Sequence, residues 1–354
     1  MTIMAITKAL FVDSKNHFKV IEVPLVPKPG KSELLIKVLF SGVNPADIKH
    51  ATQLGINNTA IGYDFAGQVI ESAENDSNYE TGDSVAGYTP SGLGRPVTYG
   101  THQTHIICPE DMLFRVPDNL PLPDAASLTT VAMTAADAVY NRLGFPLPSR
   151  KGHFEPNKPF LLWGATSSVG YCALQLSIAS GVSPIFVTAK PEHFEHLRSL
   201  GIAHLFDYRD PDVHKSIAKA LQDLGLERFE YAFDAAGAPD SGGQVLRAVS
   251  DVTRIVSTVL RNDKRFTMPV ATPGLDFVIL PPGAPHAITI PARPANHKRA
   301  WEALTWAIEN YGRSFRLPPV RVATDSAERV LEEIQRVVER GSGFSKLTVK
   351  QPLQ

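Results

Sequence analysis

A run of small residues, GATSSVG at positions 164–170, stands between an apolar stretch and a stretch with helical spacing. Dinucleotide-binding folds place small residues at relative positions 1, 3 and 6 of such a turn, so that the backbone can approach a pyrophosphate. The N–H groups and the dipole of the following helix then bind the phosphates. Here those positions hold Ala165, Ser167 and Gly170, so two of the three usual glycines are replaced. The turn predicts a dinucleotide site, and a plain strand-to-helix turn without a nucleotide is the alternative.

The next apolar stretch ends in Thr188-Ala189-Lys190, and these residues discriminate between cofactors. NAD enzymes place an acidic residue about 20 positions after the glycine motif, where it binds the ribose 2′-hydroxyl. A cation such as Lys190 instead suits the 2′-phosphate of NADPH, through a charge-assisted hydrogen bond. Tyr208 and Arg209, further along the chain, could close over the same phosphate and the adenine. The sequence favours NADPH, and a solvated Lys190 at a helix cap is the alternative.

The elements that must position these residues change in character along the chain. The first 120 residues contain short alternating β segments separated by Gly, Pro, Asn and Asp, which predicts a compact, antiparallel, barrel-like unit. The clearest of these segments are LLIKVLF (34–40), DFAGQVIE (64–71), DSVAGY (83–88) and THQTHIIC (101–108).

From about Asp124 the pattern becomes one of strands alternating with helices, which predicts a parallel sheet with right-handed crossovers. A helix at 124–143 opens this part, and the apolar run FLLW (160–163) reads as a strand buried on both faces. The helices and strands that follow are expected at 167–180, 184–188, 192–200, 204–208, 213–224, 229–235 and 252–257. The last segment, with helices at 296–309 and 326–340 and short strands at 319–324 and 346–350, is expected to return to the first domain.

Length and composition limit the classes of function. A chain of 354 residues suggests two domains, and a formal net charge of −1 gives no electrostatic reason to bind nucleic acid or an anionic membrane. No apolar run approaches the roughly 18–20 residues that span a bilayer, and the N-terminus lacks the apolar core of a signal peptide. We therefore expect no nucleic acid partner, no membrane partner and a cytoplasmic location.

Five stretches, the GATSSVG turn among them, carry a family resemblance over nearly the whole chain. With GVNPADIK (42–49), IGYDFAGQV (61–69), GDSVAGY (82–88), MTAADAVY (133–140) and GATSSVG (164–170), the chain resembles the medium-chain dehydrogenase/reductase family. The resemblance implies a GroES-like β-barrel catalytic domain, 1–127 with 275–354. It also implies a Rossmann domain, 128–274, whose doubly wound parallel sheet binds NADPH.

The alcohol dehydrogenase branch of that family holds a catalytic zinc with a Cys, a His and another Cys or an acidic ligand. Here the position of the first Cys carries Asn44, the Gly-His-Glu motif reads Gly62-Tyr63-Asp64, and the four-Cys lobe of the second zinc is missing. The resemblance therefore implies the zinc-independent branch of quinone and enoyl reductases, because alcohol oxidation would lack its usual Lewis acid.

The remaining histidines do not predict a metal site either. His102 and His105 are expected in one strand, where residues three apart point to opposite faces. His193 and His196 could share a helix face, but no third ligand stands near them in the sequence.

Within this branch, LGFPLPS (143–149), NPADIKH (44–50), KPEHFEHLRSLG (190–201) and FDYRDP (206–211) resemble the trans-acting enoyl reductases of fungal polyketide assembly lines. Such enzymes reduce acyl-carrier-bound enoyl thioesters with NADPH and without metal, so the resemblance implies an enoyl thioester substrate and an acyl carrier protein as partner. Two alternatives stay open: a free-standing reductase of small quinones or enones, and a protein that binds NADPH without turnover.

Site residues carry over by the same resemblance. The implied NADPH contacts are Ala46, Asp47, Ile48, Lys49, Thr166, Ser167, Ser168, Val169, Lys190, Pro191, Glu192, His193, Tyr208, Thr258, Val259, Phe344 and Ser345. The implied lining of the substrate and nicotinamide pocket is Thr134, Ala135, Ala136, Asp137, Ala138, Val139, Tyr140, Asn141, Leu280, Pro281, Pro282 and Gly283.

Three of these positions have side chains suited to catalysis. Hydride addition to the β-carbon builds negative charge on the thioester oxygen, so a positioned donor lowers the barrier. Lys49 is the candidate donor, to that oxygen or to the cofactor ribose; Thr134 could orient the nicotinamide amide, and Tyr63 could contribute a hydroxyl. No residue stands out as the general acid, so we expect the α-carbon proton to come from water. A solvated Lys49, a Tyr63 in the core and an Asp47 that caps a turn are the alternatives.

Overall fold

The computed structural model describes residues 7–23, 26–74, 76–148, 155, 157–271 and 274–354. The chain forms two compact units. Unit 1 comprises Met1–Thr130, Pro273–Pro294 and Pro319–Gln354, and unit 2 comprises Val131–Thr272 and Ala295–Pro318. Ser149, the last residue of the proline-rich stretch at 143–149, lies outside the described residues.

One segment of the expected domain division differs. Residues 295–318 were expected with unit 1, yet they belong to unit 2. This segment includes all of helix α8 (Pro294–Glu309) except its first residue. The reason is a set of polar contacts from α8: Asn141 Nδ2 donates to Asn296 O at 3.1 Å, and an Arg299 N–H donates to Phe145 O at 2.7 Å.

Unit 2 is built on a six-stranded, fully parallel sheet of order β11-β10-β9-β12-β13-β14. The strands are β9 (Phe160–Trp163), β10 (Ile185–Ala189), β11 (His204–Asp207), β12 (Tyr231–Asp234), β13 (Arg254–Ser257) and β14 (Phe266–Thr267). Counted from β9 the order is 3-2-1-4-5-6, the order of a doubly wound dinucleotide-binding sheet, so the expected parallel sheet is confirmed. The direction of the strand order reverses between β9 and β12, and ligands bind at the carboxyl ends of the strands at such a point.

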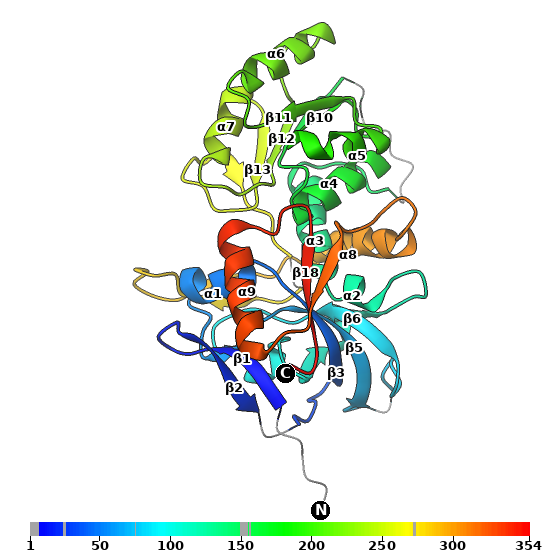
Figure 1. Ribbon diagram of the computed structural model, residues 1–354, viewed down its shortest axis with the longest axis vertical. Helices are drawn as coiled ribbons and strands as arrows, with labels where there is room; N and C mark the ends of the chain where they lie inside the picture. Colours follow the sequence, from blue (N-terminus) through cyan, green and yellow to red (C-terminus); the bar gives the residue numbers. More distant parts are fainter. Residues whose placement is uncertain (1–6, 24–25, 75, 149–154, 156, 272–273) are drawn as a thin grey trace, which may run out of the picture. The chain divides into compact units, whose positions relative to one another are not determined.

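Helices cover both faces of this sheet (Figure 1). On one side lie α4 (Ser168–Ala179) and α5 (Phe194–Ser199), and on the other α6 (Val213–Asp223) and α7 (Ser241–Ala248). In α6 the buried residues Val213, Ile217 and Leu221 follow the spacing of one helix face and join the core beside the sheet. The sequence did not predict α7, because its opening Ser-Gly-Gly is poor in helix propensity.

The helical stretch expected at 124–143 is only partly right. Residues 126–128 separate α2 (Leu122–Ala125) from α3 (Thr129–Ala136), and α3 then continues directly into the π-helix η3 (Asp137–Arg142). The buried carboxylate of Asp137 accepts hydrogen bonds from Asn141 Nδ2 at 2.9 Å, Arg142 Nε at 3.1 Å and Val270 N at 3.1 Å. Asn141 and Arg142 lie four and five residues after Asp137, within the π-helix itself, whereas Val270 is distant in sequence.

Unit 1 contains a seven-stranded sheet with the path β17-β18-β3-β5-β6-β8, in which β7 also pairs with β3. Its strands are β3 (Glu33–Gly42), β5 (Asp64–Ser72), β6 (Ser84–Tyr88), β7 (His105–Pro109), β8 (Leu113–Arg115), β17 (Val320–Ala323) and β18 (Lys346–Lys350). The strand expected at 101–108 is only partly right, since residues 101–104 lie outside β7.

A smaller sheet and a helix complete the core of unit 1. The strands β1 (Thr7–Val12), β2 (Phe18–Val23) and β4 (Thr59–Ala60) pair in the order β2-β1-β4. Helix α9 (Ala327–Arg340) packs its buried residues Ala327, Val330, Leu331 and Ile334 into one cluster with β1 and β18. Helix α1 (Ala46–Leu54) and the hairpin β15 (Phe277–Ile279)–β16 (Ile288–Ile290) also belong to this unit.

Over the described ranges, the helices are all too short or too polar to cross a membrane.

Candidate active site

The turn between β9 and α4 in unit 2 has the geometry of a phosphate-binding turn. Gly164 has a φ of +87°, a conformation that glycine adopts without strain. Ser167 is the N-cap of α4, where its Oγ accepts a hydrogen bond from Gly170 N at 3.0 Å and donates to Ala235 O at 2.7 Å. The helix N-terminus is thereby fixed against the end of β12, with the backbone N–H groups of its first turn available to an anion.

Close packing explains why glycine is kept at both ends of this turn. A Cβ on Gly170 would lie 2.3 Å from Gly164 O, and a Cβ on Gly164 would lie 2.8 Å from Ala236 Cβ. Gly170 therefore keeps the role of the third fingerprint glycine, the close approach of helix to strand. Gly164 was placed in the motif from the sequence but given no role of its own, although its position directly after the apolar run was the available signal.

A buried ion pair that was not predicted from the sequence links the carboxyl ends of β12 and β13. Asp234 Oδ2, at the end of β12, accepts from Arg261 Nη2 at 2.5 Å and from Ser257 Oγ at 2.9 Å. Arg261 Nη2 also donates to Ala238 O at 2.8 Å. Thr258 N donates to Asp234 O at 3.1 Å, so the predicted cofactor residues Thr258 and Val259 begin at this fixed junction.

The end of β10 carries the predicted 2′-phosphate contacts. Lys190 is partly exposed and its Nζ lies 3.9 Å from Glu192 Oε1, while His193 Nε2 lies 3.6 Å from the same atom. Tyr208 is 37% exposed after β11. The guanidinium of Arg209 pairs with Asp207 at 2.9 Å through both Nε and Nη2.

The predicted substrate segments differ in exposure. In unit 2, residues 135–140 are buried and the Tyr140 hydroxyl donates to Leu176 O at 3.1 Å; Thr134 and Asn141 are partly exposed. In unit 1, Leu280 is 41% exposed, and its N–H donates to Leu54 O at 2.8 Å, at the end of α1. Pro281, Pro282 and Gly283 follow it in the β15–β16 loop.

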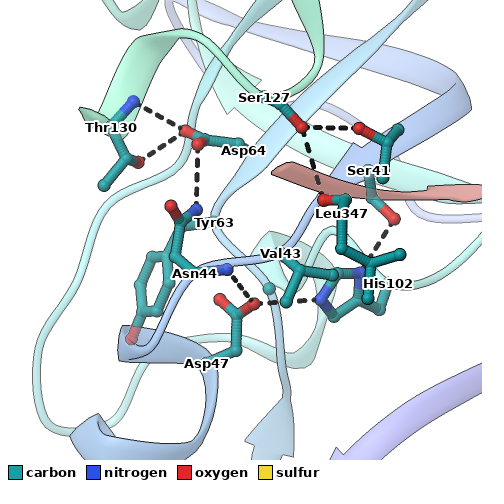
Figure 2. Close-up of polar contacts among 12 residues, drawn as sticks. Ser41, Val43, Asn44, Asp47, Tyr63, Asp64, His102, Ser127, Thr130 and Leu347 are labelled. Atoms are coloured by element: carbon teal, nitrogen blue, oxygen red, sulfur yellow. Dashed lines mark hydrogen bonds and ion pairs between the residues drawn. The ribbon is translucent and has the colours of Figure 1, made fainter. Parts of the chain in front are cut away.

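Unit 1 brings together two of the positions where the alcohol dehydrogenase branch holds zinc. Asn44 Nδ2 donates to Asp64 Oδ2 at 2.9 Å, and Asp64 Oδ1 accepts from Thr130 N at 3.0 Å and Thr130 Oγ1 at 2.5 Å (Figure 2). The Lys346 ammonium donates to Asn44 Oδ1 at 2.7 Å. Burial raises the pKa of Asp64 to about 6, and Lys346, Thr130 and Asn44 oppose that rise.

A second set of buried hydrogen bonds fixes the start of α1. Asp47 Oδ2 accepts from Asn44 N at 2.8 Å and lies 3.2 Å from His102 Nε2, while His102 Nδ1 lies 2.8 Å from Ser41 Oγ (Figure 2). Asp47, His102 and Ser41 are 3%, 0% and 0% exposed, so this Ser-His-Asp arrangement has no access to a substrate and acts as a structural brace.

Tyr63 and Lys49 lie in different environments. The Tyr63 hydroxyl shares a hydrogen bond of 2.8 Å with His50 Nδ1, and Arg95 stacks over the Tyr63 ring at 4.3 Å. Burial lowers the pKa of His50 to about 4, so the imidazole is neutral, and burial raises the pKa of Tyr63. Tyr63 is only 6% exposed and is part of the core. Lys49, by contrast, is partly exposed, and its ammonium has no hydrogen-bond or ion-pair partner among the described residues.

The residues at the former metal positions do not fit zinc. Zinc prefers thiolate and imidazole ligands, with carboxylate as a third kind. Asn44 offers an amide, Tyr63 turns its hydroxyl to His50, and both oxygens of Asp64 already accept hydrogen bonds. Lys346 brings a positive charge into the same cluster. No group of three or more His, Cys, Asp or Glu in the described part of the chain could hold a metal ion.

Comparison with known proteins places this geometry in a family. Residues 30–118 match the family described as alcohol dehydrogenase GroES-like domain, and residues 168–274 match zinc-binding dehydrogenase. The chain is 30% identical over 247 residues to a zinc-type alcohol dehydrogenase-like protein of Schizosaccharomyces pombe, covering 69% of each chain. The chain belongs to the medium-chain dehydrogenase/reductase family.

Other members of this family are also similar. The trans-enoyl reductase himH of Aspergillus japonicus is 34% identical over 212 residues, a match that covers 59% of this chain and 60% of himH. The solved CurK enoyl reductase has the same fold, with a TM-score of 0.69 and 20% identity over 98% of both chains. The expected family and its GroES-like and Rossmann folds are thus confirmed. The family implies a nicotinamide cofactor, which the Gly164–Gly170 turn and the reversal point of the sheet fit.

Proposed function

We propose that this medium-chain dehydrogenase/reductase is an NADPH-dependent, zinc-independent, trans-acting enoyl reductase. Its substrate would be the C=C bond of an α,β-unsaturated polyketide thioester. The observation that carries the proposal is the Asn44–Asp64 contact, closed by Thr130 and Lys346 at the former metal positions. These residues cannot polarise an alcohol as a metal does, whereas conjugate reduction of a thioester needs only a hydride, a donor for the oxygen and a proton. The name of himH, a trans-enoyl reductase, supports the same assignment.

The preference for NADPH rests on charge at the end of β10. Lys190 stands where an acidic residue of NAD enzymes would bind the ribose 2′-hydroxyl, and the partly buried His193 follows three residues later. A 2′-phosphate would compete with Glu192, whose oxygen lies 3.9 Å from Lys190 Nζ, for the same cation. Because the Glu192 side chain is 61% exposed, it can leave this contact at little cost.

The residues of the chain have separate tasks in this scheme. A bound nicotinamide would supply the hydride for the β-carbon. Lys49 donates a hydrogen bond to the thioester oxygen as negative charge develops there, and its ammonium has no competing partner within the described structure. Thr134 orients the nicotinamide amide, and the α-carbon proton comes from water. Tyr63 shares its hydroxyl hydrogen bond with His50, so we assign it to the wall of the site.

The substrate form we propose is a thioester carried by an acyl carrier protein, which would make such a protein the partner of this enzyme. A pantetheine thioester is the minimal mimic of that substrate, because it retains the thioester and the arm but no protein surface.

The test is NADPH oxidation measured side by side with crotonyl-pantetheine, a simple enone and a benzoquinone. We expect the highest kcat/KM with the thioester, and the same activity in the presence of a metal chelator. Turnover of the quinone alone would favour a free-standing quinone reductase. Binding of NADPH without oxidation by any of the three would mean a non-catalytic nucleotide-binding protein, and oxidation of NADH alone would refute the role of Lys190.

A further inference from the structure

Lys346, at the first position of β18, is a buried cation. The residue is 4% exposed, and its Nζ donates to Val43 O at 2.6 Å and to Asn44 Oδ1 at 2.7 Å. Lysine is almost never fully buried unless its ammonium is paired, because desolvation of a lone charge is expensive. Such a position therefore requires a compensating negative charge nearby.

Asp64 supplies that charge through the side chain of Asn44. The Asn44 amide accepts from Lys346 with its oxygen and donates to Asp64 Oδ2 with its nitrogen, at 2.9 Å. Both ends of the amide are thereby engaged, which fixes its orientation. Lys346, Asn44 and Asp64 form an amide-bridged ion pair inside unit 1, which we call the Lys346–Asn44–Asp64 chain.

The Lys346–Asn44–Asp64 chain connects two segments, residues 46–49 and 344–345, that the family resemblance assigns to the cofactor. Asn44 lies one residue before Pro45, the N-cap of α1: its carbonyl accepts from Asp47 N at 3.0 Å, and its N–H donates to Asp47 Oδ2 at 2.8 Å. It therefore sets the start of the turn that presents Ala46–Lys49. Lys346 immediately follows Phe344–Ser345, and Lys346 N donates to Pro319 O at 3.0 Å. The Lys346 ammonium thus contacts Asn44, a residue 302 positions away in the sequence.

We propose that Lys346 is a positioning residue for the nicotinamide nucleotide: its ammonium fixes residues 46–49 relative to residues 344–345 through Asn44. The proposal rests on the function proposed above. We do not assign Lys346 itself to cofactor or substrate contact, since its ammonium donates to two protein oxygens, Val43 O and Asn44 Oδ1. Displacement of a bound group by about 1 Å can cost up to about 100-fold, so even a small shift of these segments would be measurable.

The test compares Lys346→Met, Lys346→Arg and the matched control Lys350→Met. Lys350 lies in the same strand four residues later, with an exposed side chain. Because Lys346→Met leaves the Asp64 carboxylate buried without its cation and can impair folding, the double variant Lys346→Met/Asp64→Asn removes both charges together. Calorimetry first establishes that each variant unfolds cooperatively.

The readout is binding of two nucleotides, measured by titration calorimetry. NADPH would contact residues 46–49 and 344–345, the segments that the Lys346–Asn44–Asp64 chain positions. By contrast, 2′,5′-ADP carries only the adenosine end of the nucleotide, which we assign to Lys190 and Tyr208 in unit 2. We expect the Kd of NADPH to rise at least about tenfold in Lys346→Met and in the double variant, with partial recovery in Lys346→Arg. The Kd of 2′,5′-ADP should stay within twofold of the value for Lys350→Met. A general loss of stability would instead raise the Kd of both nucleotides.

Two results would overturn the proposal. One is a folded double variant that binds NADPH as tightly as Lys350→Met; the other is equal weakening of NADPH and 2′,5′-ADP. Failure of the wild-type protein to bind NADPH at all would instead refute the proposed function, so the two failures are distinguishable.

Discussion

Substitution of Gly170 by alanine should weaken both the fold of unit 2 and nucleotide binding, against the usual preference of helices for alanine. Alanine stabilises a helix interior by about 1 kcal/mol relative to glycine. At position 170, however, the new Cβ would lie 2.3 Å from Gly164 O and 2.8 Å from Ser167 Oγ. Overpacking of this kind costs about 1–3 kcal/mol, and loss of the Ser167 N-cap adds about 1 kcal/mol.

We therefore expect Gly170→Ala to lower the free energy of unfolding by about 2 kcal/mol in urea denaturation. Gly243 in α7 provides the matched control, because the nearest atom that a Cβ would meet there is Arg247 Nη1 at 3.8 Å. Gly243→Ala should raise the free energy of unfolding by up to about 1 kcal/mol, the bare helix-propensity effect.

The same comparison applies to nucleotide affinity. Gly170→Ala moves the first turn of α4 away from Gly164, so the Kd of NADPH should rise at least about tenfold, while Gly243→Ala leaves it unchanged. A Gly170→Ala protein that is as stable as Gly243→Ala and binds NADPH normally would refute the close-packing account of this turn.

Three further predictions follow from single side chains. Lys190→Gln should reduce the preference for NADPH over NADH by roughly tenfold in kcat/KM, the worth of one charge-assisted hydrogen bond, and an unchanged ratio would contradict the 2′-phosphate assignment. Lys49→Ala should lower kcat/KM for the thioester about 100-fold without changing the stability of the fold; full retention of kcat and KM would remove its assigned role. Burial raises the pKa of Asp64 from its ordinary value of 3.8 to about 6 in the folded protein, so between these two pH values the folded form keeps a proton that the unfolded chain has lost. Its contribution to stability therefore falls by about 2 kcal/mol as pH rises from 4 to 7. Asp64→Asn should lack this decline in urea titrations at several pH values, and parallel pH profiles for the two proteins would contradict the raised pKa.

The parts of the fold that the sequence predicted well are those specified by local pattern. FLLW at β9 is apolar throughout because the strand is buried on both faces, and α9 repeats its buried residues with helical spacing. The helix–strand alternation that follows predicted the parallel sheet. Each of these signals lies within a few residues of the feature it predicts.

The parts that escaped prediction depend on partners distant in sequence. The π-helix at 137–142 needs Val270 N on the Asp137 carboxylate, and His102 leaves the expected strand to reach Asp47 and Ser41. Nothing near Lys346 in the sequence indicates that it will be buried against Asn44. Helix α7 forms despite two glycines because its apolar residue Val245 packs into the core of unit 2.

The central claim is that hydride reaches the β-carbon of an unsaturated thioester. It is tested most directly with NADPH that carries deuterium at both C4 positions of the nicotinamide ring, crotonyl-pantetheine as acceptor and mass spectrometry of the product. We predict butyryl-pantetheine with one deuterium at C3, in an amount equal to the NADPH oxidised, and no label at C2, where the proton comes from water. Oxidation of NADPH with no saturated thioester formed, or a product that carries no deuterium at C3, would contradict it.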